Sequence, residues 1–204
     1  MKMLSEWDSK QVLGPELPRP NEAMTRTKQQ ALRFARELGR PVVAKASGVA
    51  HKSEAGLVRT GLDARMLGSV WEELARAGDG SVLIAEQVGA ELELIAGGIR
   101  DPQFGPLVSV GLGGVAAEVF EDAVFVLAPP EPGELERAIQ RLRCAPLLNG
   151  YRGKPPVDRD ALHAIVDAIA ALLTTDDEVV EIDCNPVLVR NGRPLVADAL
   201  VVKR

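Results

Sequence analysis

The chain ends in EVVEIDCNPVLVR (178–190), NG (191–192) and RPLVADALVV (193–202). An Asn-Gly pair between two runs of strand-forming residues is typical of a β-hairpin with a two-residue turn. Upstream, helix-then-strand segments recur at residues 25–47 and 64–88, and further strands follow at 91–101 and 104–112. Because βα units and antiparallel hairpins are mixed, the sequence favours an α+β fold of two lobes over a doubly wound parallel sheet.

The hairpin brings oxygen-bearing side chains together. If residues 191–192 form the turn, Arg190 pairs with Arg193, and counting inward places Asn185 opposite Asp198. Opposed side chains lie about 5 Å apart at Cβ, and Asp183 shares a strand face with Asn185. Carboxylate and amide oxygens suit Mg²⁺, which also takes phosphate oxygens and water. The hairpin therefore predicts a metal site.

One residue disturbs this count. Pro186 falls at a hydrogen-bonded pair and has no N–H to donate, so we expect a bulge or fraying there, and a slip of register by one residue stays open. The alternative interpretation is a solvent-facing, acid-rich strand. Asp198 argues against it, because its neighbours along the strand are apolar and a buried carboxylate needs a cation or donors.

Two segments near the N-terminus can bind phosphate. Lys45 lies in the apolar strand PVVAKAS (41–47), from which a lysine can reach the phosphates of a nucleotide; a lysine snorkelling from a sheet edge is the alternative. The loop SGVAHKSEAG (47–56) follows. Its amides and Lys52 can cradle phosphate, and His51 can accept a phosphoryl group on a ring nitrogen.

A connector after the strand SVLIA (81–85) is a candidate for base recognition. Glu86, Gln87 and Val88 lead into Gly89, and Glu91 follows, close enough to bond ribose hydroxyls. The GLGG at 111–114 is a weaker signal, since it lacks the full GxGxxG and we expect no clear strand–helix context there. The sequence contains neither a P-loop nor a kinase HRD/DFG set, which excludes the commonest ATP-binding folds.

Composition limits the classes of partner and the compartment. The net charge is −5, with no long basic block, which disfavours nucleic acid. Cys144 and Cys184 are far apart and without metal-ligand spacing, which indicates reduced thiols. The N-terminus lacks a signal-peptide core, and no apolar run approaches the roughly 18 residues that span a membrane. We expect a cytoplasmic protein that does not bind membranes.

Taken in order, the segments resemble the ATP-grasp domain of the NDP-forming acyl-CoA synthetases. They look most like the β subunit of ADP-forming acetyl-CoA synthetase and, more distantly, the succinyl-CoA synthetase β chain. The segments that carry the resemblance are LSEWDSKQVL, RPVVAKASGVAHKSEAG, LIAEQVGAELELIAGGIRDPQFGPLVSVGLGG, PLLNGYRGKPPVD, and EIDCNPVLV with VADA.

The resemblance implies an ATP-grasp fold with the nucleotide between two lobes, residues 1–85 and residues 86–204, the second carrying the metal-binding hairpin. It implies that Asn185 and Asp198 bind Mg²⁺, and that His51 carries phosphate between sites. The implied nucleotide-binding positions are Lys45, Lys52, Ser53, Glu86, Gln87, Val88 and Glu91.

The implied reaction is acyl-CoA + ADP + phosphate ⇌ carboxylate + CoA + ATP through a phosphohistidine. The chain matches only the nucleotide half, so the resemblance implies an α subunit that carries the CoA site, in a hetero-oligomer. Two alternatives stay open. Leu57 and Val126 stand where the family usually has Gly and Arg, which motivates a non-catalytic, ATP-binding regulatory or scaffold subunit; another ATP-grasp carboxylate ligase is the second alternative. The acyl acid and the choice of ADP or GDP are not specified.

Overall fold

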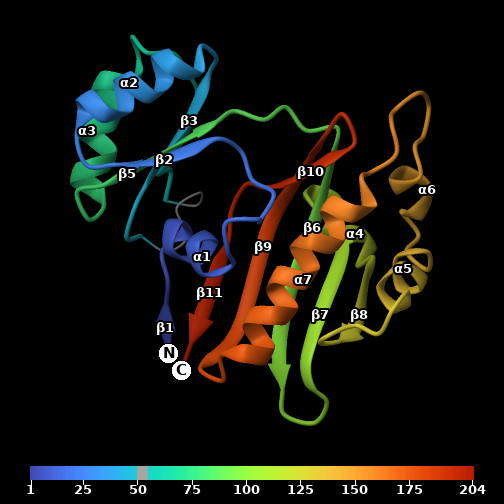
Figure 1. Ribbon diagram of the computed structural model, residues 1–204. Coiled ribbons are helices and arrows are strands. Elements are labelled where there is room, and N and C mark those ends of the chain that lie inside the picture. Colours follow the sequence, from blue (N-terminus) through green and yellow to red (C-terminus); the bar gives the residue numbers. More distant parts are fainter. Residues whose placement is uncertain (50–54) are drawn as a thin grey trace. The chain divides into compact units, whose positions relative to one another are not determined.

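The computed structural model describes residues 1–49 and 55–204 (Figure 1). The chain forms two compact units: residues 20–88, and residues 1–19 together with 89–204. We expected a division into 1–85 and 86–204. The observed junction at 88–89 is close to that boundary, but the first 19 residues belong to the unit that contains the C-terminus.

The smaller unit, residues 20–88, is an antiparallel sheet with two helices. Among the described residues its strands lie in the order β2-β5-β3-β4, and α2 and α3 pack against the sheet. The elements are β2 (Glu22–Thr25), α2 (Lys28–Leu38), β3 (Val42–Ala46), β4 (Val58–Leu62), α3 (Leu67–Ala77) and β5 (Val82–Glu86).

Local sequence explains the ends of α2. Thr27 caps its first turn by accepting from the N–H of Gln30, and the Gln30 side chain bonds back to the Thr27 N–H. Gly39 ends the helix in a left-handed conformation, which glycine adopts readily. Ala31 and Ala35 on the apolar face are buried against the sheet.

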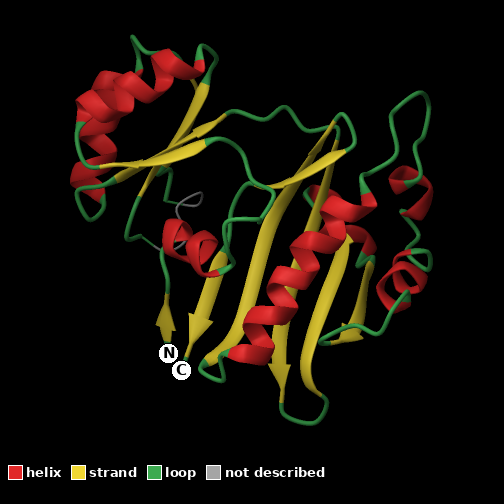
Figure 2. Cartoon of the chain, in the orientation of Figure 1, coloured by secondary structure: helices red, strands yellow, loops and turns green. Residues whose placement is uncertain are grey.

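The larger unit is built on a sheet that the described residues form in the order β1-β11-β9-β6-β7-β8, with β10 also pairing with β9. Figures 1 and 2 show α7 lying across one face of this sheet. The elements are β1 (Lys2–Met3), α1 (Glu6–Val12), β6 (Leu92–Asp101), β7 (Gly105–Leu112), α4 (Val115–Phe120), β8 (Ala123–Leu127), α5 (Glu134–Ile139), α6 (Ala145–Leu148), α7 (Arg159–Thr175), β9 (Val179–Arg190), β10 (Arg193–Val196) and β11 (Leu200–Lys203).

The N-terminal segment belongs to this unit because it hydrogen-bonds to the last strands. β1 pairs with β11, with Met3 opposite Val202. The Ser9 hydroxyl accepts from the N–H of Val201 at 3.0 Å, and the N–H of Val196 donates to the carbonyl of Pro18 at 2.8 Å. Buried backbone groups need such partners, so residues 1–19 are fixed to the hairpin although they are distant from it in sequence.

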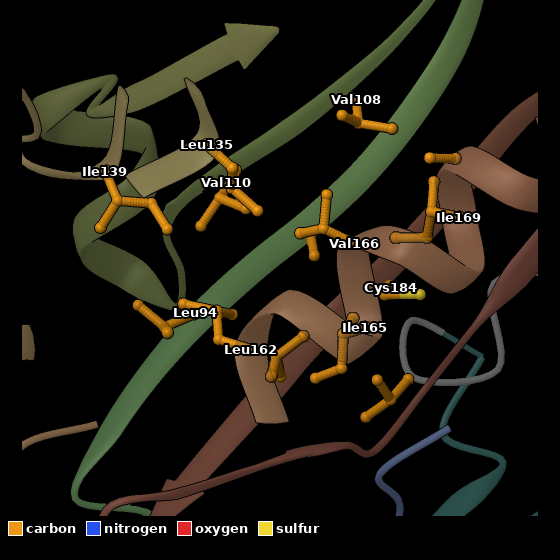
Figure 3. Close-up of a cluster of buried hydrophobic side chains, with 14 of the residues drawn as sticks. Leu94, Val108, Val110, Leu135, Ile139, Leu162, Ile165, Val166, Ile169 and Cys184 are labelled. Atoms are coloured by element: carbon orange, nitrogen blue, oxygen red, sulfur yellow. The ribbon is translucent and has the colours of Figure 1, made fainter. Parts of the chain in front are cut away.

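The core of the larger unit lies between α7 and the sheet (Figure 3). Leu162, Ile165 and Ile169 of α7 are fully buried there. Gly98 on β6 allows the close approach, because a Cβ at that position would lie 2.5 Å from Cδ1 of Leu173. Among the described residues, none of the helices has the length and hydropathy of a membrane span.

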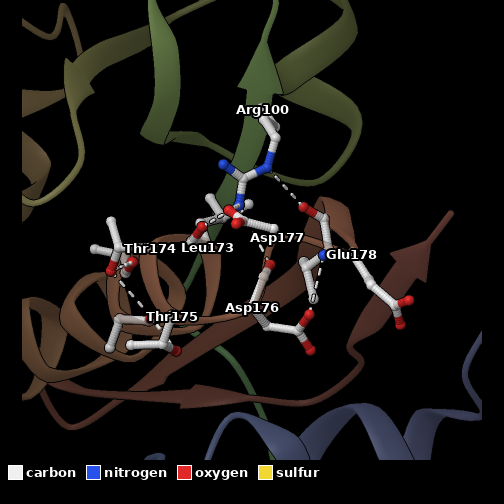
Figure 4. Close-up of polar contacts among 10 residues, drawn as sticks. Arg100, Leu173, Thr174, Thr175, Asp176, Asp177 and Glu178 are labelled. Carbon is white, nitrogen blue, oxygen red and sulfur yellow. Dashed lines mark hydrogen bonds and ion pairs between the residues drawn. The ribbon is translucent and has the colours of Figure 1, made fainter.

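Arg100 at the end of β6 closes the C-terminus of α7 (Figure 4). Its guanidinium donates to the carbonyl oxygens of Leu173, Asp176 and Val179. The last carbonyls of a helix have no partner within the helix. Arg100 satisfies those of Leu173 and the capping residue Asp176, and its bond to Val179 joins the helix end to β9.

Helix α5 is short. α5 ends at Ile139, and the chain turns before α6. The buried carboxylate of Asp122 accepts from the N–H groups of Arg143 and Cys144 at 2.8 and 2.7 Å. These bonds give the two N–H groups partners outside a helix, which accounts for its early end.

Candidate functional site

The hairpin has the predicted register. Arg190 pairs with Arg193 across the Asn-Gly turn, and Val187 pairs with Val196. Beyond an interruption at residues 197–199, Asp183 pairs with Leu200. In an antiparallel pair, each step forward on one strand is a step back on the other, so the two residue numbers of every pair add up to the same total. The pairs on both sides of the interruption share that total, so they belong to one register. The slip that Pro186 left open does not occur, and this register sets Asn185 opposite Asp198.

Pro186 does interrupt the second strand. The N–H of Ala197 donates to the carbonyl of Pro186 at 3.0 Å, but Pro186 cannot return the bond. Nζ of Lys10 donates to the carbonyl of Ala197 instead, at 2.9 Å. β10 therefore ends at Val196, and Asp198 lies in the gap before β11 begins.

The acidic residues at this point repel one another. Desolvation raises the pKa of Asp183, and the negative charges of Glu181 and Asp198 raise it further. Carboxylates that disfavour each other's ionisation are stabilised by a divalent cation, so the donor set fits Mg²⁺. Within residues 1–49 and 55–204, no three His, Cys, Asp or Glu side chains are grouped to hold a metal by themselves, so an ion here would use Asn185 and non-protein oxygens as well.

Lys45 is in the middle of the smaller sheet, not at its edge. It pairs with Val58 of β4 on one side and with Leu83 of β5 on the other, and only 8% of its surface is exposed. The interpretation as a lysine snorkelling from an edge strand is therefore wrong. The Lys45 ammonium is therefore held among the strands of the sheet, largely out of solvent.

The connector at Glu86–Val88 is well ordered by hydrogen bonds within the smaller unit. The Glu86 carboxylate accepts from Arg40 at 2.6 Å and from Asn21 at 3.0 Å. The N–H groups of Glu86 and Gln87 donate to the carbonyls of Asn21 and Pro41. These contacts fix the connector and occupy the N–H groups of Glu86 and Gln87, so neither of these two N–H groups is available to a ligand.

Glu91 of the larger unit has a cationic neighbour that the sequence did not indicate. Its N–H donates to the carbonyl of Val189 on the hairpin. Its carboxylate lies 3.9 Å from Nζ of Lys154, a residue of the YRGK loop. This loop was recognised only as part of a matching segment; its lysine is a further candidate for contact with an anionic ligand.

The GLGG segment has the strand–helix context that we did not expect. β7 ends at Leu112 and α4 begins at Val115, with Gly113 and Gly114 between them. A Cβ at Gly113 would lie 2.8 Å from the backbone of Leu94, so this glycine is needed for close approach of two chain segments. His51, Lys52 and Ser53 lie outside the described residues.

Comparison with known proteins gives consistent matches over nearly the whole chain. A model of the ATP-grasp domain matches residues 1–202. The β subunit of ADP-forming acetate–CoA ligase II from Pyrococcus furiosus is 34% identical over 212 residues, covering 97% of this chain and 90% of that protein. The β subunit of ligase I from the same organism is 33% identical over 197 residues, covering 91% and 85%.

Solved structures agree. The dinucleotide-forming acetyl-coenzyme A synthetase 1 of Candidatus Korarchaeum cryptofilum, in complex with coenzyme A, Ca-AMPCP and HgCl⁺, superposes with a TM-score of 0.88 at 33% identity, covering 100% of this chain and 94% of that one. Another structure of that protein, with coenzyme A and Mg-AMPPCP, has its phosphohistidine segment pointing towards the nucleotide-binding site; its TM-score is 0.82 at 32% identity, with coverage of 98% and 92%.

Proposed function

Because this chain belongs to the ATP-grasp family, we propose that it is the nucleotide-binding β subunit of an ADP-forming acyl-CoA ligase. The reaction is acyl-CoA + ADP + phosphate ⇌ carboxylate + CoA + ATP, with Mg²⁺ as the metal. The observation that carries the proposal is the continuous register of the hairpin, which sets Asn185 opposite Asp198 with Asp183 two residues along β9.

Each proposed residue has a defined task. Asn185, Asp198 and Asp183 hold Mg²⁺, which neutralises charge on the nucleotide phosphates. Lys45 binds those phosphates with its ammonium, and Lys52 and Ser53 do so from the following loop. Backbone groups of Glu86–Val88 receive the base, and Glu91 bonds to the ribose. These assignments rest on the family resemblance and on the local geometry within each unit.

His51 is the proposed phosphoryl carrier. In the direction of ATP use, a ring nitrogen of His51 forms a bond to the γ-phosphorus as the bond to the ADP oxygen breaks. The phosphoryl group then passes to the acyl carboxylate on an α subunit that carries the CoA site, and CoA displaces phosphate to give the thioester. A covalent carrier keeps the phosphoryl group from being lost to water between two sites.

The test is transfer of ³²P from γ-labelled ATP to the chain in the presence of Mg²⁺. The wild type should be labelled and His51→Ala should not. His163→Ala is the matched control, because His163 lies on α7 and no role in the reaction is assigned to it; it should be labelled like the wild type. Labelling of His51→Ala at the wild-type level would reject the relay.

The non-catalytic alternative loses part of its motivation in the structure. Val126 is buried in the core of the larger unit, and Leu57 packs against the core of the smaller one. Both departures from the family pattern therefore have a packing role. A regulatory subunit would bind ATP without labelling of His51, and an amide-forming ligase would consume ATP with an amine in place of CoA, so the same preparation separates the three functions.

A further inference from the structure

α1 contains an ion pair that is removed from solvent. Nζ of Lys10 lies 2.9 Å from Oε1 of Glu6, and their side chains are 0% and 3% exposed. Burying two charges costs desolvation free energy, and apolar side chains of similar size often stabilise a fold equally well. A stabilising contribution alone therefore does not account for this pair, and a second contact made by Lys10 indicates a further role.

That contact is at the interruption of the hairpin. An N–H at residue 186 would normally donate to the carbonyl of Ala197, but Pro186 has none. The Lys10 ammonium occupies this position, donating to the Ala197 carbonyl at 2.9 Å. Lys10 therefore supplies a charged donor at the point where the ladder lacks one, at the residue just before Asp198.

The segment around Lys10 also fixes both flanks of the interruption. On the β11 side, the Ser9 hydroxyl accepts from the N–H of Val201, and the N–H of Leu4 donates to the Val201 carbonyl at 2.9 Å. On the β10 side, the N–H of Val196 donates to the Pro18 carbonyl. Residues 1–19 therefore hydrogen-bond to the backbone on both sides of Asp198, at Val196 and at Val201.

We propose that Lys10 is a positioning residue for the metal site: it fixes the Ala197 carbonyl so that Asp198 stays outside the ladder and opposite Asn185. This rests on the proposed function of the hairpin. The negative charge of Glu6 balances the positive charge of Lys10. Lys10 can therefore position Asp198 while the pair adds no net positive charge that would repel Mg²⁺.

The test replaces the pair by neutral side chains of similar length, E6Q/K10M, which keeps the net charge and removes the donor to Ala197. Binding of ADP is measured with increasing Mg²⁺ and, separately, in EDTA. Groups that orient metal ligands typically change metal affinity by about 10–100-fold. We expect the Mg²⁺ concentration for half-maximal enhancement of ADP binding to rise at least about tenfold, while ADP affinity in EDTA and the melting temperature change little.

D176N/K203M is the matched control. Lys203 of β11 and Asp176 at the end of α7 form an ion pair of 2.6 Å. This variant makes the same kind of neutral replacement away from Ala197 and should keep the wild-type Mg²⁺ dependence. Should E6Q/K10M fail to fold, Ser9→Ala removes the hydrogen bond between the Ser9 hydroxyl and the N–H of Val201. For this variant we expect the Mg²⁺ concentration for half-maximal enhancement of ADP binding to rise about threefold.

The outcomes separate the two proposals. If the wild type shows no Mg²⁺-dependent ADP binding, the proposed function and this inference both fail. If the wild type shows it and E6Q/K10M does so equally, only the role of Lys10 is overturned. An equal loss of ADP binding with Mg²⁺ and in EDTA would reduce Lys10 to a structural residue and also overturn the inference.

Discussion

Asp158 donates its backbone N–H to the carbonyl oxygen of Gly192 at 2.8 Å, which ties the turn of the hairpin to the first turn of α7. Gly192 has φ +78°, and a Cβ there would lie 2.4 Å from the carbonyl oxygen of Pro156. The position thus requires glycine for two reasons, backbone conformation and close approach.

Gly192→Ala should therefore destabilise the protein by more than about 2 kcal/mol in urea denaturation. Gly153→Ala is the control: Gly153 has a similar φ of +80°, but no atom lies within 4 Å of its Cβ position, and its cost should be about 1 kcal/mol. Equal effects of the two substitutions would contradict the close packing of the turn against Pro156.

Asp183→Asn should stabilise the metal-free protein near neutral pH. Desolvation and the charges of Glu181 and Asp198 raise the pKa of Asp183 in the folded state. The charged carboxylate therefore opposes folding above its raised pKa, and this penalty disappears as the pH falls below the unfolded value of about 3.9. Melting temperatures in EDTA should show the variant above the wild type at pH 7 and the gap closing in acid; a lower melting temperature at pH 7 would contradict the prediction.

Both thiols should be unreactive in the native protein. Desolvation, together with a hydrogen bond to Asp122, raises the pKa of Cys144 to about 12. Desolvation, together with the charge of Asp183, raises the pKa of Cys184 to about 12 as well. The thiolate fraction at pH 8 is then on the order of 10⁻⁴. Ellman's reagent should label both cysteines in urea and neither within minutes in buffer; rapid native labelling of either one would refute this.

Lys45→Met should weaken ADP binding at least about tenfold, because a charge-assisted contact to phosphate is lost while the size of the buried side chain is kept. Lys28→Met is the control within the same unit, since Lys28 forms a partly exposed ion pair with Glu72 at 2.8 Å and such pairs contribute little. Calorimetric titration measures both. Unchanged affinity in Lys45→Met would exclude Lys45 from the nucleotide site.

The parts of the structure that depend on local sequence could be predicted. The Asn-Gly turn fixed the pairing of Arg190 with Arg193, and from it the position of Asp198. Gly39 is a local signal of the same kind, because a glycine that follows an apolar helical face predicts the end of the helix, and α2 ends there. The strands β2, β4 and β8 were missed, because each is only four or five residues long and lacks the alternation that distinguishes a strand from a connector.

What depends on contacts between distant residues could not be predicted. Glu6 and Lys10 are four apart on a helix, a spacing that in most proteins indicates a solvent-exposed pair. Nothing in their own segment shows that they are buried against residues near position 197. The one available signal was the missing N–H of Pro186, which implied that some other donor must satisfy the Ala197 carbonyl.

The most direct test of the account is the Mg²⁺ dependence of ADP binding in the wild type and in Asp198→Asn, by calorimetry with excess Mg²⁺ or EDTA. Asp177→Asn, at a side chain that is 95% exposed, is the control. The account predicts that Mg²⁺ strengthens ADP binding at least about tenfold in the wild type and the control, and hardly at all in Asp198→Asn, where one metal-binding carboxylate is lost. A wild type that binds ADP equally with and without Mg²⁺, or an Asp198→Asn variant that keeps the full enhancement, would contradict it.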